Sequence, residues 1–223
     1  MEVVVVLVSS GPVVWARAQV GWFDAVNHLA RATPWLNEPA RWYAEYGVVL
    51  FAALLLLSWW LARRDADLRK VTAALWAPVG ALLALGVNQL LVAWFAEPRP
   101  YTVLPHAFTL ATRSADYAFP SDHAVMAGAV AAGVLLAHRR LGLATVVLAM
   151  AMAFVRVYIG AHFPVDVAAG LLVGAGISVT GFLLLRPVGT RSVQVLLRTW
   201  ARPLLTAAQA SSALHRRRPT VGR

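Results

Sequence analysis

The chain has 223 residues, of which 60% are hydrophobic and 13% are charged, and its mean hydropathy is +0.65. A soluble domain carries about twice that charged fraction, so the composition excludes an ordinary soluble enzyme and indicates one helical bundle embedded in a membrane. The sequence contains no cysteine, which excludes disulfides and thiolate metal sites.

The first 46 residues precede the first predicted membrane span. Residues 1–19 include an apolar run that is too short to cross a bilayer, with Glu2 as the only early charge, so we interpret them as a leader or an interfacial segment. Residues 20–46 mix tryptophan and tyrosine with charged side chains. This mixture predicts one or two amphipathic helices in the membrane interface, with a break near Pro34.

Five apolar stretches follow and predict five transmembrane helices within a domain at residues 47–185. The remaining segment, residues 186–223, is rich in arginine and predicts a basic, mobile tail. The expected fold is therefore an all-α integral membrane protein with about five spans and an N-terminal amphipathic interfacial segment. The predicted spans are Gly47–Ala62, Val71–Phe95, the short His123–Ala137, Leu141–Tyr158 and Val165–Leu185.

The basic residues are distributed unequally between the two sides of this predicted bundle. With five spans, 14 of the 20 lysines and arginines fall on the side that carries the C-terminal tail. The positive-inside rule places that side in the cytoplasm, so the loops at residues 96–122 and 159–164 face outside. The net charge of +10 then reflects topology and attraction to anionic lipid, and it does not indicate a nucleic-acid partner.

Three polar clusters lie at the ends of spans on the outer side. AEPRPY contains Arg99 and follows the second span, FPSDH opens the third span, and RVYIGAHFPVD joins the fourth span to the fifth. Arg99 and Arg156 are permanent cations whose forked donors suit the oxygens of a phosphate. Ser121 is placed to cap the third helix, whose free amides and positive end favour an anion.

The histidines in these clusters add reactive groups. Asp166 lies four residues after His162 and could accept a hydrogen bond from one imidazole nitrogen, which would leave the other nitrogen free as a nucleophile. His123 could then protonate the leaving oxygen. Asp122 could cap the helix or tune His123, and it could equally repel an anionic substrate. Together these residues indicate phosphoryl transfer through a phosphohistidine, and the sequence contains no cluster of metal ligands.

These motifs resemble the three signature motifs of the type 2 phosphatidic acid phosphatase superfamily. The matching stretches are RP at 99–100, PSDH at 120–123, and the R-x5-H-x3-D pattern that begins at Arg156. FPSDH is similar to the bacterial undecaprenyl-diphosphate phosphatase branch of that superfamily. The resemblance implies an integral-membrane enzyme that needs no metal or other cofactor and acts on a polyprenyl or other lipid phosphate in the bilayer. It implies His162 as the nucleophile, Asp166 as its orienting carboxylate, His123 as the acid, and Arg99, Arg156 and Ser121 as ligands of the phosphoryl oxygens.

One position departs from the family pattern, because the lysine seven residues before the motif arginine is replaced here by Val92. Arg113 in the outer loop could supply the missing cation, or the affinity for substrate could differ. The substrate therefore stays open among undecaprenyl diphosphate, phosphatidic acid, phosphatidylglycerophosphate and other prenyl phosphates. A non-catalytic binder or a transporter is the alternative from another class, although such a protein has no use for His162, Asp166 and His123 together. The sequence does not specify an oligomeric state.

Two further pairs of residues favour structural roles. Asn88 and Gln89 lie within the second span and predict hydrogen bonds between helices more than contacts with substrate. Gly170 and Gly174, four residues apart in the fifth span, predict close packing of two helices.

Overall fold

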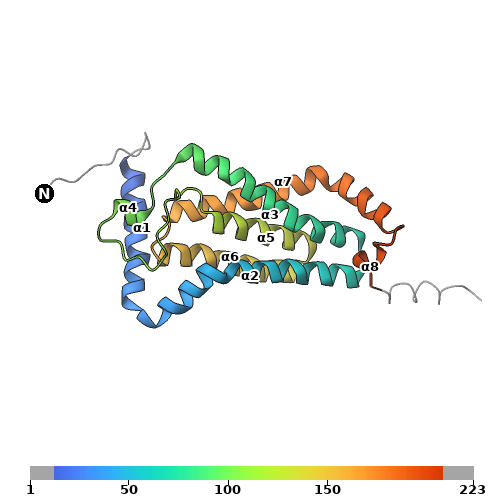
Figure 1. Ribbon diagram of the computed structural model, residues 1–223, viewed down its shortest axis with the longest axis horizontal. Coiled ribbons are helices and arrows are strands. Elements are labelled where there is room, and N and C mark those ends of the chain that lie inside the picture. Colours follow the sequence, from blue (N-terminus) through green and yellow to red (C-terminus); the bar gives the residue numbers. More distant parts are fainter. Residues whose placement is uncertain (1–12, 208–223) are drawn as a thin grey trace, which may run out of the picture.

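The computed structural model describes residues 13–207, which form helices and loops and contain no strand (Figure 1). Four helical segments are long and apolar enough to cross a membrane, and α5 is a shorter apolar helix. The prediction of an all-α membrane protein is therefore confirmed. The helices are α1 (Val13–Ala32), α2 (Pro34–Asp65), α3 (Leu68–Phe95), α4 (Pro100–Val103), α5 (Asp122–Ala137), α6 (Arg139–Tyr158), α7 (Pro164–Leu196) and α8 (Arg202–Leu205).

Helix α5 is the most deeply buried element of the bundle and packs against α7, α3 and α6. Its side chains are mostly alanine, glycine and valine, which lets its neighbours approach closely. A side chain at Gly174 of α7 would overlap the main chain of α5 at Val125, and one at Gly170 would lie 2.9 Å from the Ser121 carbonyl oxygen. These contacts confirm that the two glycines allow close helix packing.

Asn88 and Gln89 connect α3 to the start of α5. Asn88 is fully buried, and its Nδ2 donates to the Pro120 carbonyl oxygen at 3.1 Å and to Asp122 Oδ1 at 2.7 Å. Gln89 Nε2 donates to the same Asp122 oxygen at 3.0 Å. The predicted interhelical hydrogen bonds are confirmed, and they hold the beginning of the helix that carries His123.

The N-terminal helices support the end of the bundle at which the polar loops lie. Helix α1 crosses this end, and the buried Asn27 binds both the amide and the carbonyl of Phe108, at 2.8 and 2.7 Å (Figure 1). The predicted break near Pro34 separates α1 from α2. Beyond it, α2 continues without interruption to Asp65, so the first predicted span shares one helix with the aromatic segment before it.

The chain after residue 185 differs from the mobile tail that the sequence predicts. Helix α7 continues to Leu196, and the following segment returns to α2, where Trp59 and Arg63 donate to the carbonyl oxygens of Leu204 and Pro203 at 3.0 and 3.1 Å. The few apolar side chains of this segment explain the difference, because they are buried against α2 and α3. The predicted tail beyond residue 207 and the first 12 residues of the leader predicted at residues 1–19 lie outside the described residues, while residues 13–19 belong to α1.

Candidate active site

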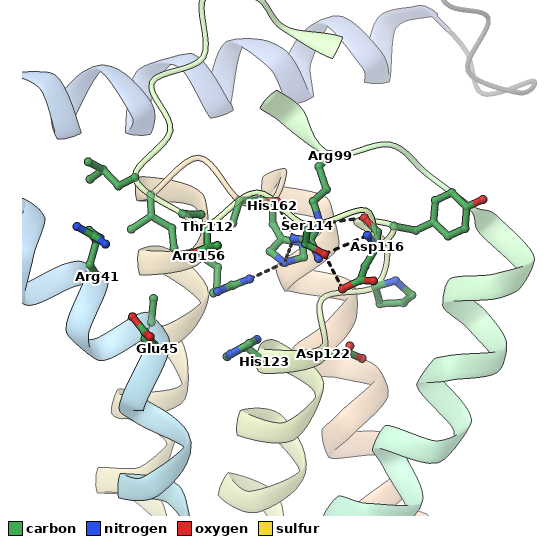
Figure 2. A pocket seen from close by; sticks show the side chains of 17 residues that line it. Arg41, Glu45, Arg99, Thr112, Ser114, Asp116, Asp122, His123, Arg156 and His162 are labelled. Carbon is green, nitrogen blue, oxygen red and sulfur yellow. Dashed lines mark hydrogen bonds between the residues drawn. The ribbon is translucent and has the colours of Figure 1, made fainter. Parts of the chain in front are cut away.

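A cavity of about 330 Å³ opens at the end of the bundle near α1 (Figure 2). This volume lies in the range of pockets that bind small molecules. The cavity brings together residues from all three polar clusters, which lie far apart in the sequence. The charged and imidazole side chains that line it are Arg41, Glu45, Arg99, Asp116, Asp122, His123, Arg156 and His162.

His162 lies in the loop between α6 and α7 with 2% of its surface exposed. Gly160, two residues earlier, has φ of +76°, a backbone conformation that glycine adopts without strain, and it shapes the turn that leads to the histidine. The Nδ1 atom of His162 lies 2.9 Å from the carbonyl oxygen of Ala118 and donates to it. This hydrogen bond selects the tautomer in which Nε2 carries the free electron pair.

Asp166 is fully buried in the first turn of α7, behind the histidine. Its Oδ2 accepts a hydrogen bond from the Phe163 amide at 2.8 Å and lies 3.6 Å from His162 Nδ1. The sequence predicted that this carboxylate accepts the imidazole proton, whereas in the structure the Ala118 carbonyl does so. The difference arises because the start of α7 presents an amide to the same carboxylate oxygen. A main-chain acceptor such as Ala118 leaves no signal in the sequence.

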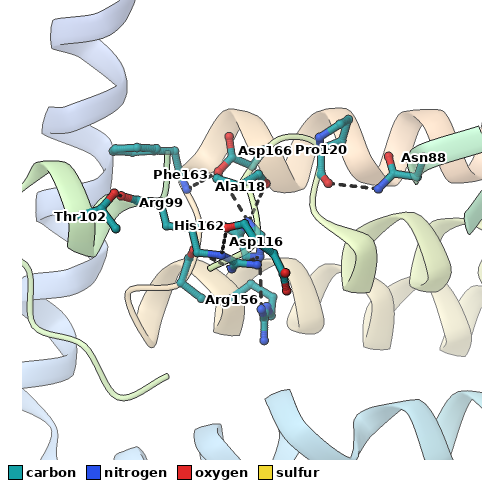
Figure 3. Close-up of polar contacts among 11 residues, drawn as sticks. Asn88, Arg99, Thr102, Asp116, Ala118, Pro120, Arg156, His162, Phe163 and Asp166 are labelled. Atoms are coloured by element: carbon teal, nitrogen blue, oxygen red, sulfur yellow. Dashed lines mark hydrogen bonds and ion pairs between the residues drawn. The ribbon is translucent and has the colours of Figure 1, made fainter. Parts of the chain in front are cut away.

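Two arginines converge on the other imidazole nitrogen (Figure 3). Arg99 Nη1 and Arg156 Nη2 each lie 3.2 Å from His162 Nε2. Arg99 is held in place by hydrogen bonds to the carbonyl oxygens of Asp116, at 3.0 Å, and Ala161, at 3.3 Å. The two guanidinium groups therefore concentrate positive charge and donors beside Nε2, where a phosphoryl group would meet a nucleophile.

The surroundings of His162 also determine its charge. Burial lowers the pKa of His162 well below its usual value, and the nearby cations of Arg156 and Arg99 lower it further. The imidazole is consequently neutral at physiological pH. A neutral imidazole whose free Nε2 faces two arginines can attack phosphorus and accept a phosphoryl group.

Three predicted site residues lie at the start of α5, and the structure places them differently. His123 lines the cavity, as Asp122 does, while Oδ1 of Asp122 is held by Asn88 and Gln89. Ser121 occupies the predicted N-cap position, but its buried Oγ makes no hydrogen bond with the described residues. Asp122 is thus tied to α3.

The cation that could replace the family lysine is placed differently from the expectation. Arg113 is exposed, its guanidinium carbon lies 5.8 Å from the centre of the Tyr101 ring, and it does not line the cavity described above. Arg41 of α2 does line that cavity, together with Glu45 one turn later. Neither residue was predicted as part of the site, because their spacing in the sequence indicates only a shared helix face. Within residues 13–207, no group of three or more His, Asp or Glu side chains is placed to hold a metal ion.

Comparisons with known proteins agree with the geometry. A model of the PAP2 superfamily matches residues 73–188. The chain is 32% identical over 164 residues to "Undecaprenyl-diphosphatase BcrC" of Bacillus subtilis (strain 168), with 74% of this chain and 81% of the relative covered. It is 30% identical over 160 residues to "Bacitracin transport permease protein BcrC" of Bacillus licheniformis, with 72% and 77% covered.

The fold is similar to the crystal structure of a transmembrane PAP2-type phosphatidylglycerolphosphate phosphatase from Bacillus subtilis. The TM-score is 0.57 at 23% identity, and the similarity covers 74% of this chain and 86% of that one. The family match spans more than half of the chain and includes all three motifs, from Arg99 to Asp166. The chain therefore belongs to the PAP2 superfamily and is a membrane-embedded lipid phosphatase.

Proposed function

We propose that the protein hydrolyses undecaprenyl diphosphate to the monophosphate at the outer face of the bacterial cytoplasmic membrane. The observation that carries this proposal is the placement of His162, whose Nε2 lies 3.2 Å from both Arg99 Nη1 and Arg156 Nη2. The FPSDH motif and the relative named undecaprenyl-diphosphatase support this choice of substrate. The product would be the lipid monophosphate that serves as a carrier in the synthesis of the cell wall.

In the proposed reaction, the terminal phosphoryl group binds between Arg99 and Arg156 and takes over the donors that now point at Nε2. Nε2 of His162 attacks phosphorus in line with the bridging oxygen, so that a P–N bond forms while the P–O bond breaks. The negative charge of the bound diphosphate favours the protonated form of His123, which then gives this proton to the departing lipid phosphate. Water then attacks the phosphohistidine and loses its proton to His123, and the P–N bond breaks to release inorganic phosphate.

The groups behind the nucleophile support this reaction electrostatically. The phosphorylated imidazole carries a positive charge, which the Ala118 carbonyl and the carboxylate of Asp166, 3.6 Å from Nδ1, would stabilise. Asp166 would thus act through charge and through the start of α7. The Oγ of Ser121 has no partner in residues 13–207, but Ser121 is fully buried and does not line the cavity, so we assign it no contact with the phosphoryl group.

The proposed orientation rests on the two ends of the bundle. The cavity lies at the end near α1 and α4, whereas α8 lies at the other end (Figure 1). The helix ends that meet between α2 and α3, and the start of α6, carry basic residues, as does the chain after α7, and the positive-inside rule places them in the cytoplasm. They are Arg63, Arg64, Arg69, Lys70, Arg139 and Arg140. The cavity would then face outside, with the lipid tail in the bilayer and the C-terminal tail inside.

The direct test is phosphate release by the detergent-purified protein in EDTA. Undecaprenyl diphosphate and phosphatidic acid are compared, and His162→Ala is run in parallel. We expect release from the prenyl substrate and none from the variant. Release from phosphatidic acid alone would keep the mechanism and replace the substrate. A variant as active as the parent would refute the histidine mechanism.

A transport function is the second candidate, because one relative is named a transport permease. The two functions differ at the chemical step. Transport requires binding by Arg99 and Arg156 but no covalent intermediate. Brief reaction with a substrate labelled with ³²P in the terminal phosphate, followed by an alkaline quench, should retain label on the protein, because phosphohistidine survives alkali. The His162→Ala variant should retain none.

A further inference from the structure

Arg41 is a charged side chain of the cavity that the reaction at His162 leaves without a role. Helix α2 contributes Arg41, Ala44 and Glu45 to the cavity wall, and their spacing places them on one face of the helix. This part of α2 precedes residues 73–188, which match the superfamily. The three motifs of the site therefore do not account for Arg41.

The arginines of the cavity form two groups. Arg99 and Arg156 both contact Nε2 of His162. Arg41 lies across the opening, on the side formed by α2, as Figure 2 shows. Arg99 and Arg156 together can bind an anion that has a single phosphate. An anion with two phosphates carries a second charged phosphate, which would lie further along the cavity.

The present partner of Arg41 can be exchanged. Its Nη1 donates to Glu38 Oε1 at 3.1 Å, and the two side chains are 45% and 70% exposed. An ion pair as exposed as this one contributes little to stability. A phosphate offers more charge and a geometry that the guanidinium fork can bind through two oxygens, so it would compete effectively with Glu38.

We propose that Arg41 binds the phosphate that remains on the lipid and thereby makes the cavity select a diphosphate over a monophosphate. This inference rests on the proposed function, since the terminal phosphoryl group must occupy the site at His162. Arg41 would also offset the negative charge that grows on the leaving phosphate as the P–O bond breaks. It would supply from α2 a cation that Val92 does not supply from α3. Glu45, one turn away, disfavours an anion beside it and so restricts where the second phosphate binds.

The test compares the full-length parent with Arg41→Gln and Arg41→Lys. Arg64→Gln is the matched control, because it removes the same charge from an exposed position at the opposite end of the same helix. We expect Arg41→Gln to lower kcat/KM for undecaprenyl diphosphate by about 10- to 100-fold, the range for lost hydrogen bonds to a charged group. Arg41→Lys should restore part of the loss, and Arg64→Gln should change kcat/KM less than about 3-fold. An Arg41→Gln variant with the activity of the parent would overturn the inference.

A binding measurement separates this inference from the proposed reaction. Methylenediphosphonate, which cannot be hydrolysed, and orthophosphate are titrated in EDTA while the thermal unfolding temperature is followed. The parent should bind the diphosphonate more tightly, and Arg41→Gln should weaken that binding by about 10-fold or more while orthophosphate changes less than about 3-fold. Equal weakening for both anions would overturn the selectivity. A parent that prefers the diphosphonate through Arg41 yet releases no phosphate from lipid would refute the reaction and leave this binding site standing.

Discussion

Replacement of Asn88 by alanine tests how α3 holds the beginning of α5. The substitution removes a hydrogen bond of 2.7 Å to the Asp122 carboxylate and one of 3.1 Å to the Pro120 carbonyl oxygen. A hydrogen bond to a charged group contributes about 1.5–3 kcal/mol in soluble proteins, while hydrogen bonds between membrane helices average about 0.6 kcal/mol. Gln89 still binds Asp122 in the variant, and the unpaired Oδ1 of Asn88 disappears, so part of the loss is offset. We expect a loss of about 1–2 kcal/mol in the free energy of unfolding.

The same substitution should also lower kcat, by more than the modest loss in the free energy of unfolding would suggest. The bonds from Asn88 position the turn at the start of α5, which carries Asp122 and His123 beside the cavity. A displacement of about 1 Å at a reacting group can lower a rate by about 100-fold. We therefore expect kcat to fall by about 10-fold or more, with a smaller change in KM.

The assay combines denaturant titration in mixed micelles with phosphate release from the lipid substrate. Gln89→Ala is the matched control, because it removes one exposed hydrogen bond to the same carboxylate and should change stability by less than about 0.5 kcal/mol. Asn88→Asp should be worse than Asn88→Ala, since it places a second carboxylate beside Asp122. Equal stability and activity for Asn88→Ala and Gln89→Ala would refute the reasoning.

Three other predictions address the nucleophile, the helix packing and the C-terminal segment. Because the pKa of His162 is lowered, its imidazole stays neutral as the pH falls, so protonation of this group should reduce kcat/KM only well below pH 6.5. In a pH series of phosphate release, loss of kcat/KM on the acid side with a midpoint near pH 6.5 would contradict this. Gly174→Ala should destabilise the bundle by about 1–3 kcal/mol through overlap with the main chain of α5, whereas Gly176→Ala, with open space around it, should be neutral or stabilising in the same denaturant titration. Trp59→Phe removes the donor to the Leu204 carbonyl and should accelerate proteolysis after residue 196 with unchanged phosphatase activity; unchanged proteolysis would show that this bond does not hold the segment.

Local properties of the chain were sufficient to predict the membrane class and the main elements. Hydrophobic length, turn residues and the distribution of arginine lie along the sequence, so α3, α5, α6 and α7 and the polar loops between them could be located. The spacing of Arg99, Arg156, His162 and His123 relative to the span ends predicted that they meet, and the structure places all four around one cavity. The end of α7 was predicted too early, because burial of a few apolar side chains after residue 185 depends on contacts with α2 and α3.

Composition and local spacing along the chain were enough to predict the class of protein and the residue types gathered at one end of the bundle. Which atoms surround the nucleophile depends instead on how the helices pack against one another. The acceptor for His162 Nδ1 is the main-chain carbonyl of Ala118, and carbonyl groups are identical at every residue, so no residue type reveals it. The placement of Arg41 in the cavity depends on the rotation of α2 about its axis, which is set by packing against distant helices.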